Sequence, residues 1–355
     1  MTQFQKAIVV QEVGKPVALI SNQPIPTPGP LQVQLKVTVA GLNPHDQKGR
    51  DFGLFTQGRL PAAVLGNDVV GVVTQLGPDV HGISVGDRIV TQGFLKLDGG
   101  NSDQSALQEY AVADLSALAK IPDSVSDDEA ATLPTNIIAP VVGLFHDLQI
   151  PAPWIDDDAR SKKAFDYAGS TVLVIGGGTN NGRFAVQLAK LAGIGQIVAV
   201  GGDEAELKGF GATHVLDRHG GHDAVLARIK AAVGDDLVYA LDTVNAPADQ
   251  HLGVNALSDS RKGLLARLVP TGPIDASKVT GAKRGGYEVL NVFGSSQANP
   301  ELCAPFWARL PGYLSNGDIK PLGYVAKEGL DAAAVNEVLD AYRDGGRVVK
   351  THFHI

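Results

Sequence analysis

Three consecutive glycines, Gly176 to Gly178, stand between a short apolar run and a longer run with helical spacing. The preceding run, residues 171–175 ("TVLVI"), is typical of a buried strand, and apolar side chains recur every three or four positions in the following "RFAVQLAKLAG". The alternation continues to residue 244 through the strand-like runs "QIVAVG", "THVLD" and "LVYALDTV". Strands that alternate with helices form a parallel sheet covered on both faces, so this part predicts an α/β fold with a doubly wound parallel sheet.

The glycine loop predicts a dinucleotide site. Such a site needs a tight turn, a backbone with no side chain in the way of the pyrophosphate, and a helix N-terminus aimed at it. The spacing departs from the strict G-x-G-x-x-G fingerprint by one residue, but the loop follows a strand and opens an amphipathic helix, which is the required context. The loop residues predicted to bind the cofactor are Gly177, Gly178, Thr179, Asn180, Asn181 and Gly182.

The end of the second strand indicates which dinucleotide binds. An acidic residue there would hold the ribose 2′-hydroxyl of NAD and repel the 2′-phosphate of NADP. This chain has Gly201 and Gly202 instead, and the following Asp203 is well placed to cap a helix. Lys208 and Arg218 are nearby cations, although a solvated surface lysine and a turn arginine would look the same in sequence. We therefore predict NADPH as the cofactor, with Gly201, Gly202, Lys208 and Arg218 among its contacts.

Length and composition limit the rest. The chain has 355 residues, enough for two domains, and residues 1–135 consist of short β-like runs broken by Gly and Pro. The net charge of −8 argues against nucleic acid or an anionic membrane as a partner. The single cysteine, Cys303, allows no internal disulfide and predicts a reducing, cytoplasmic location. We recognise neither a signal peptide nor an apolar run of about 18 residues, so we expect no transmembrane helix.

The chain resembles the medium-chain dehydrogenase/reductase superfamily over nearly its whole length. Within that superfamily it is similar to the zinc-free quinone-oxidoreductase branch, and particularly to fungal stand-alone (trans-acting) enoyl reductases. The resemblance implies a Rossmann dinucleotide-binding domain over 141–289 and a split, coiled β-rich GroES-like catalytic domain over 1–140 and 290–355, with the active site in the cleft between them. The matching stretches, in the family order, are "AGLNPHDQK", "LGNDVVGVVTQLG", "VGDRIV", "LQEYAVAD", "IPDSVSDDEAATLP", "VLVIGGGTNNGRFAVQLAKLAG", "GATHVLD" and "NGDIKP".

The same resemblance implies roles for individual residues. Asn43 and His45 would be the catalytic residues beside the nicotinamide, and Thr135, Phe293 and Ser295 would contact the nicotinamide end of the cofactor.

Two departures from the family pattern affect the site. Arg218 stands where a tyrosine usually flanks the adenosine phosphate, and a guanidinium suits a phosphate well. Some enoyl reductases of the superfamily carry a tyrosine proton donor shortly after the "NP-x-D" motif, and this chain has "KGRDFGLFTQG" there. His45 or solvent would then have to supply the proton.

We expect no metal. Zinc members of the superfamily use a Cys, His, Cys set, and tetrahedral zinc needs such N and S ligands. This chain has Asn43 at the first ligand position and Gly66-Asn67-Asp68 in place of Gly-His-Glu. Two histidine pairs lack a third ligand in sequence: His219 with His222, and His352 with His354.

Three functions remain for comparison with the structure. The first is a zinc-independent, NADPH-dependent oxidoreductase that transfers a hydride to an activated C=C (enone or enoyl thioester) or to a quinone. Its substrate would be a small molecule such as a polyketide or other enone, and the protein a monomer or homodimer. The second is an NADPH-binding protein of the same fold with little or no turnover, which the missing tyrosine and the irregular "TNNG" loop favour. The third, zinc-dependent alcohol oxidation, conflicts with the ligand positions. Residues with an expected structural role, or with both possibilities open, are Asp68 and Asp242 (structural carboxylates) and Phe52, Phe55 and Trp307 (pocket wall or core).

Overall fold

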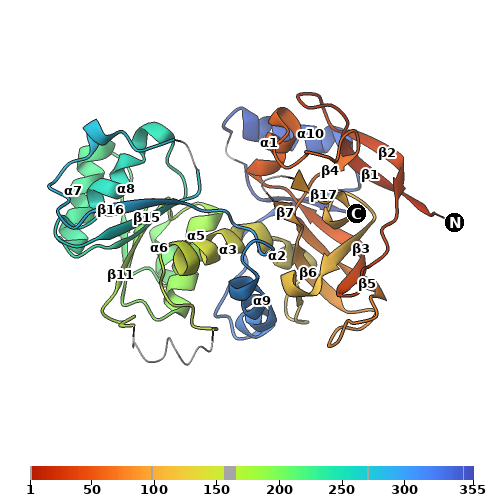
Figure 1. The fold of residues 1–355 in the computed structure, drawn as a ribbon, viewed down its shortest axis with the longest axis horizontal. Helices are drawn as coiled ribbons and strands as arrows, with labels where there is room; N and C mark the ends of the chain where they lie inside the picture. The colour runs from red at the N-terminus through yellow and green to blue at the C-terminus, as the bar shows by residue number, and fades with distance from the viewer. Residues whose placement is uncertain (1, 97–98, 156–164, 270–271, 347) are drawn as a thin grey trace. The chain divides into compact units, whose positions relative to one another are not determined.

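The computed structural model describes residues 2–96, 99–155, 165–269, 272–346 and 348–355. Two compact units make up the chain (Figure 1). Unit 1 comprises residues 1–135, 295–317 and 321–355, and unit 2 comprises 136–294 and 318–320. The sequence predicts the domain boundaries near residues 140 and 290, whereas the units of the structure meet at residues 135/136 and 294/295. Residues 318–320 join unit 2 because the side chain of Gln187 holds the backbone of Lys320 at both its N–H and its carbonyl.

Unit 2 is built on a six-stranded parallel sheet with the order β13-β12-β11-β14-β15-β16. The order reverses between β11 and β14, which is the switch point at which doubly wound sheets bind ligands. The predicted alternation of strands and helices is confirmed. The elements are β11 (Thr171–Ile175), α5 (Asn180–Leu191), β12 (Gln196–Val200), α6 (Glu204–Phe210), β13 (His214–Leu216), α7 (Gly221–Val233), β14 (Tyr239–Asp242), η4 (Pro247–Asp249), α8 (His251–Ala256), β15 (Gly263–Arg267), η5 (Ala276–Lys278) and β16 (Tyr287–Asn291).

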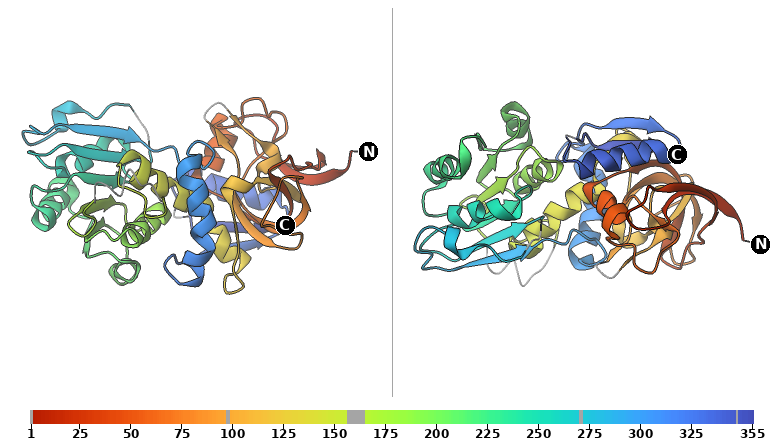
Figure 2. Two further views of the ribbon diagram at one scale, coloured as in Figure 1. Left: turned by 60° about the horizontal axis from the view of Figure 1, so that its bottom comes forward. Right: turned by 90° about the horizontal axis from the view of Figure 1, so that it is seen from above.

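The strands of unit 2 are apolar on both faces because helices cover both. Leu173 and Ile175 pack in one buried cluster with residues of α7 and α8, such as Ile229 and Leu252. Successive strand residues point to opposite faces, so Val172 and Val174 face the side on which α5 packs against β11 and β12. Figure 2 shows helices on both sides of this sheet.

Unit 1 contains a three-stranded sheet, β2-β1-β4, and a larger sheet in the order β10-β6-β5-β3-β18-β17, with β9 paired to β3. The C-terminal segment returns to this unit, as the sequence predicts, because β18 pairs with β3. The elements are β1 (Phe4–Val10), β2 (Ala18–Pro24), β3 (Gln32–Gly41), α1 (Pro44–Phe52), β4 (Ala63–Val64), β5 (Asp68–Leu76), β6 (Arg88–Gln92), β7 (Leu95–Lys96), β8 (Gly99–Gly100), η1 (Ser102–Gln104), β9 (Tyr110–Asp114), η2 (Leu115–Ala117), β10 (Leu118–Lys120), α2 (Asp127–Ala131), α9 (Pro300–Ser315), β17 (Val325–Glu328), α10 (Ala332–Arg343) and β18 (Thr351–His354).

Three local predictions from the sequence can be compared with the structure. The run 128–148 contains Pro134 and Pro140, which predicts two helices or one kinked helix; the structure forms α2, then α3 (Pro134–Val141), then the π-helix η3 (Val142–Asp147). The break precedes Pro134, and Pro140 lies inside α3. The family resemblance implies a strand over "NVFGSSQ" (residues 291–297), the stretch that contains Phe293 and Ser295, but this stretch is mostly not a strand because β16 ends at Asn291. The polar, proline-containing run 151–165 predicts an exposed loop, and it falls largely on residues 156–164, outside the described residues.

None of the helices in the described parts of the chain is long and apolar enough to span a bilayer.

Candidate cofactor and active site

The glycine loop of unit 2 lies at the carboxyl end of β11 and is packed backbone against backbone. A Cβ on Gly177 would lie 2.8 Å from the carbonyl oxygen of Gly201, and a Cβ on Gly178 would lie 2.7 Å from the Cα of Gly202. A Cβ on Gly182 would lie 2.2 Å from the Gly176 carbonyl oxygen. A side chain at Gly177 or Gly178 would push the loop away from Gly201 and Gly202. A side chain at Gly182 would push α5 away from the loop. These glycines are therefore required for close packing of the loop backbone against its neighbours, in addition to their predicted role in binding a pyrophosphate.

Thr179 caps α5. Its Oγ1 accepts a hydrogen bond from the Gly182 N–H at 2.9 Å, so that N–H is not free for a phosphate. The backbone N–H groups of Gly178, Asn180 and Asn181 have no partner among the described residues, and they stand at the start of the helix. Free N–H groups at a helix N-terminus are donors for a pyrophosphate. The Asn181 side chain instead donates to the Asn136 carbonyl at 3.2 Å.

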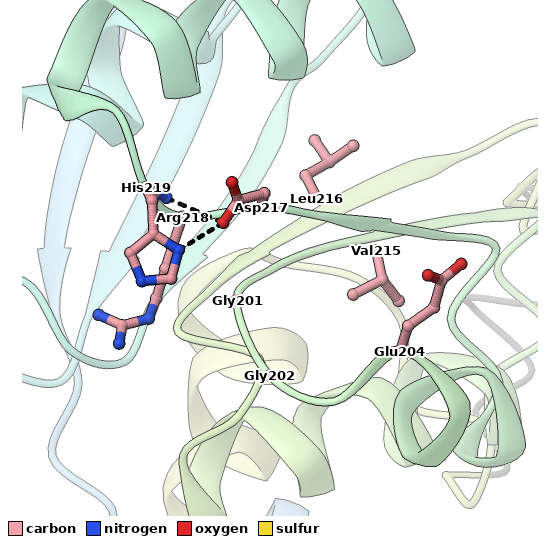
Figure 3. A pocket seen from close by; sticks show the side chains of 8 residues that line it. All are labelled: Gly201, Gly202, Glu204, Val215, Leu216, Asp217, Arg218 and His219. Atoms are coloured by element: carbon pink, nitrogen blue, oxygen red, sulfur yellow. Dashed lines mark hydrogen bonds and ion pairs between the residues drawn. The ribbon is translucent and has the colours of Figure 1, made fainter.

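A pocket of about 300 Å³ opens beside this loop, at the carboxyl ends of β12 and β13 (Figure 3). Gly201 and Gly202 form one wall, and a Cβ on Gly201 would lie 3.0 Å from the Arg218 Cδ, so the arginine stem covers a glycine. Asp203 caps α6 by accepting from the Glu206 N–H at 2.8 Å, which confirms the role given to it by the sequence. The lining residues are Gly201, Gly202, Glu204, Val215, Leu216, Asp217, Arg218 and His219.

The charged side chains in and near this pocket differ in whether they have partners within the described residues. Asp217 accepts from the backbone N–H of His219 at 3.1 Å and from its Nδ1 at 2.6 Å, and these bonds lower the pKa of the Asp217 carboxyl. Lys208 pairs with Glu204 at 2.7 Å and is not among the lining residues. Arg218 is exposed and forms no ion pair with the described residues (Figure 3). Arg218 is therefore the cation of the predicted set that stays available to a bound group.

In unit 1, Asn43 and the start of α1 are buried in a polar network. The Asp46 carboxylate accepts from the Asn43 backbone N–H at 2.8 Å and from the Gly66 N–H at 2.9 Å. The Asn43 side chain is 2% exposed; its Nδ2 donates to Asp68 Oδ2 at 2.8 Å and its Oδ1 accepts from Lys350 Nζ at 3.0 Å. Both ends of the amide are thus engaged within the protein.

Asp68 and Lys350 form a buried ion pair. Burial acts to raise the pKa of Asp68, but the Lys350 ammonium and hydrogen bonds from Asn43 and the Thr135 N–H hold that pKa below its ordinary value. The structure thus gives Asp68 the hydrogen-bonded structural role expected for it. Sequence reasoning missed Lys350. A lone cation directly before the buried run "THF" is the signal that could have found it.

His45 is the more accessible of the two predicted catalytic residues, with 18% of its side chain exposed. Its Nε2 lies 2.8 Å from Asn67 Oδ1, and the Phe55 ring stands edge-on with centroids 6.2 Å apart. Because an amide oxygen only accepts, Nε2 carries the proton and Nδ1, which has no partner among the described residues, presents a lone pair in the neutral ring. A proton can leave His45 through Nδ1 only from the doubly protonated ring.

The residues expected at the nicotinamide end are placed separately. Thr135 uses its backbone N–H for Asp68, and its buried Oγ1 has no partner within the described chain. Ser295 is fully buried in unit 1, donating to the Leu95 carbonyl at 2.8 Å and accepting from the Ala298 N–H. Phe293 is half-buried in unit 2, two residues beyond β16.

The carboxylates and aromatic residues left open by the sequence are also placed. Asp242 accepts from the N–H groups of Val244 and Asn245, and burial raises its pKa. Trp307 is core, with its Nε1 donating to Ser296 Oγ, whereas Phe52 is 75% exposed.

The donors present at the zinc-ligand positions do not suit zinc. Asn43 and Asn67 offer amides already bonded to Asp68 and His45, and Asp68 is paired with Lys350. Within the described residues no group of three or more His, Cys, Asp or Glu side chains is arranged to hold a metal. His222 stacks on His251, and both His352 and His354 bond Asp128.

Comparison with known proteins decides the family. The Alcohol dehydrogenase GroES-like domain family matches residues 29–123, and the Zinc-binding dehydrogenase family matches 182–268. Trans-enoyl reductase resD of Aspergillus sclerotiorum is 31% identical over 353 residues, spanning 94% of this chain and 96% of that protein. The chain belongs to the medium-chain dehydrogenase/reductase superfamily.

Solved structures show the same fold. The CurK enoyl reductase superposes with a TM-score of 0.74 at 20% identity, covering 99% of both chains. An alcohol dehydrogenase superfamily protein from Novosphingobium aromaticivorans gives a TM-score of 0.75 at 22% identity, again over 99% of both chains. This member of the superfamily is therefore an oxidoreductase with a Rossmann unit and a GroES-like unit, and its family uses a nicotinamide dinucleotide.

Proposed function

We propose that this oxidoreductase uses NADPH, without zinc, to reduce an activated C=C bond of an enone or enoyl thioester, or a quinone. The observation that carries the proposal is the pocket after β12 and β13, where Arg218 lies over Gly201 and has no acidic partner among the described residues. The printed names of its relatives, which are trans-enoyl reductases, support the choice of acceptor. We further propose a cytoplasmic protein that acts as a monomer or homodimer.

The residues of unit 2 fit such a cofactor. The free N–H groups of Gly178, Asn180 and Asn181 would hold the pyrophosphate, and the Arg218 guanidinium would bind the 2′-phosphate as a fork. NADPH, when bound, supplies the hydride.

The residues of unit 1 would stabilise the acceptor. We propose that His45, with both ring nitrogens protonated, donates from Nδ1 to the oxygen on which negative charge develops, while Asn67 Oδ1 accepts from its Nε2. Asn43, whose amide is engaged at both ends, would act by positioning the start of α1. A conjugated carbonyl or a quinone delocalises the negative charge that hydride transfer brings. Its reduction therefore requires less stabilisation by the protein than the formation of an alkoxide from a saturated ketone.

A second candidate is an NADPH-binding protein with little turnover. Burial of the Asn43 side chain favours it, because a residue that is 2% exposed and bonded to Asp68 and Lys350 is poorly accessible to a substrate.

The test is NADPH consumption against a panel of enones, enoyl thioesters and quinones, with saturated ketones as the comparison. We expect turnover with the conjugated acceptors alone. The His45→Gln variant should lose about 10²–10³-fold in kcat, the usual loss on removal of one transition-state donor. Tight NADPH binding without reduction of any acceptor would select the binding protein instead.

A further inference from the structure

Gly41, in the larger sheet of unit 1, leaves the space of a side chain free on one face of the sheet. It ends β3, which lies between β5 and β18, and it is the register partner of Asp68 on one side and of His352 on the other. A Cβ on Gly41 would lie 2.9 Å from the Asp68 Cβ and 3.1 Å from the Lys350 Nζ. The absence of a side chain at this position therefore lets the Lys350 side chain pass across β3 and reach Asp68.

The Lys350 ammonium has all its hydrogen bonds inside the protein. It carries three N–H groups. They meet three acceptors: the Leu42 carbonyl at 3.0 Å, Asn43 Oδ1 at 3.0 Å, and Asp68 Oδ2. Lys350 is 2% exposed and Asp68 fully buried. Two well-packed apolar side chains would stabilise a fold at least as well as such a pair, so stability alone does not account for it.

The pair ties together the two stretches that hold His45. The Asn43 side chain, one residue before α1 begins, donates through its Nδ2 to Asp68 and accepts through its Oδ1 from Lys350. Asp46, in the first turn of α1, is bonded to Gly66, and His45 is bonded to Asn67, the neighbour of Asp68. Residues 43–46 and 66–68 are thus joined by side-chain bonds, and the buried Lys350 holds the two residues at one end of this set, Asn43 and Asp68.

We propose that Lys350 is a positioning residue for the reductase site: through Asp68 and Asn43 it sets the start of α1, and so the orientation of the His45 ring. The inference rests on the proposed function, in which His45 faces the substrate.

The experiment compares two paired substitutions. In Lys350→Met/Asp68→Asn both buried charges are removed together, so that neither is left unpaired. The matched control is Lys327→Met/Glu337→Gln, which removes the pair formed at 3.1 Å between β17 and α10, where both side chains are more exposed. We expect both variants to fold and to bind NADPH within twofold of the parent. The kcat on the best conjugated acceptor should fall at least 10-fold in the first variant and stay within twofold in the control.

A second readout does not depend on turnover. Spectra of ¹⁵N-histidine-labelled protein, with His45 assigned through His45→Gln, report which ring nitrogen carries the proton. The parent and the control should show a fixed Nε2–H tautomer, and the Lys350→Met/Asp68→Asn variant should show exchange between tautomers. If the parent reduces no acceptor, the proposed function fails and this signature still tests the positioning. An unchanged signature in the variant, or a kcat within threefold of an active parent, would overturn the inference.

Discussion

At the residue scale, several side chains that look alike in sequence have opposite environments. Lys208 and Arg218 are both cations near the predicted cofactor, yet one is paired with Glu204 and the other has no partner in the described structure. His352 and His354 share one face of β18 and bond the same carboxylate, Asp128, at 3.0 and 2.9 Å. The first ring is fully buried and the second is 35% exposed. These differences lead to two predictions.

Arg218→Ser should weaken NADPH binding about 10- to 100-fold and leave NADH binding unchanged, because a lost charged hydrogen bond costs about 1.5–3 kcal/mol. Calorimetric titration of both nucleotides measures it, with NADH as the internal control. Parent protein that binds NADH as tightly as NADPH would contradict the cofactor assignment.

The buried His352 should make the protein acid-sensitive. Burial and the nearby Lys350 lower its pKa to about 4, from an ordinary value of 6.5. Because the unfolded chain binds this proton more readily, the free energy of unfolding should fall as the pH drops from about 6.5 to about 4, by about 3 kcal/mol in all. Urea unfolding at several pH values measures this loss, which His352→Gln should reduce.

His354→Gln is the matched control for that experiment. Hydrogen bonds to Asp128 and Glu328 raise the pKa of His354, so this ring stabilises the folded state at acid pH and its removal should steepen the loss. Equal acid profiles in the parent and His352→Gln would exclude His352 as the source.

At the element scale, the loop between β11 and α5 shows how glycines set the distance between elements. Gly182 lies in the first turn of α5 directly against the Gly176 carbonyl, where no side chain fits. Asn180 stands at the first position of the same helix with a half-exposed side chain. Its contribution to a phosphate would come from its backbone N–H.

We expect Gly182→Val to abolish NADPH binding or to prevent folding, and Asn180→Ser to bind NADPH within about threefold of the parent. The valine must displace α5 from the loop, whereas serine keeps the backbone donor and is tolerated near helix N-termini. Circular dichroism establishes whether each variant is folded, and fluorescence titration measures the affinity. A valine variant that binds normally would show that the pyrophosphate lies elsewhere.

At the scale of the whole molecule, the family match and the side chains at the ligand positions differ in what they imply. The match to zinc-binding dehydrogenases covers residues 182–268, while Asn43, Asn67 and Asp68 stand at the ligand positions implied by the resemblance. Amides that are already hydrogen-bonded, and a carboxylate neutralised by Lys350, are poor substitutes for thiolate and imidazole ligands.

Protein purified without a histidine tag should therefore contain well under one zinc per chain, and chelators should leave its activity unchanged. Elemental analysis by mass spectrometry and an assay after dialysis against a chelator are the measurements. Stoichiometric zinc whose removal abolishes activity would overturn the zinc-free assignment.

The sequence by itself determined the architecture of unit 2 and the place of its glycine loop at the end of β11. The periods of apolar residues, the glycines after β11 and the cap at Asp203 are local signals, because the residues that produce each of them lie within a few positions of one another. The departures from the family pattern at Asn43 and Asn67 are also legible in sequence.

Only the tertiary structure decided what those site residues contact. Lys350 meets Asp68 across 282 positions of sequence, and it does so because β18 and β5 flank β3 at the level of Gly41. Strand order and register arise from packing of the whole unit. For this reason no local sequence pattern predicts that the Asn43 amide bonds both Asp68 and Lys350. The same holds for the pairing of Lys208 with Glu204 and for Arg218, which has no partner in the part of the chain that the structure describes. A charge is available to a ligand only if the folded chain brings no opposite charge to it.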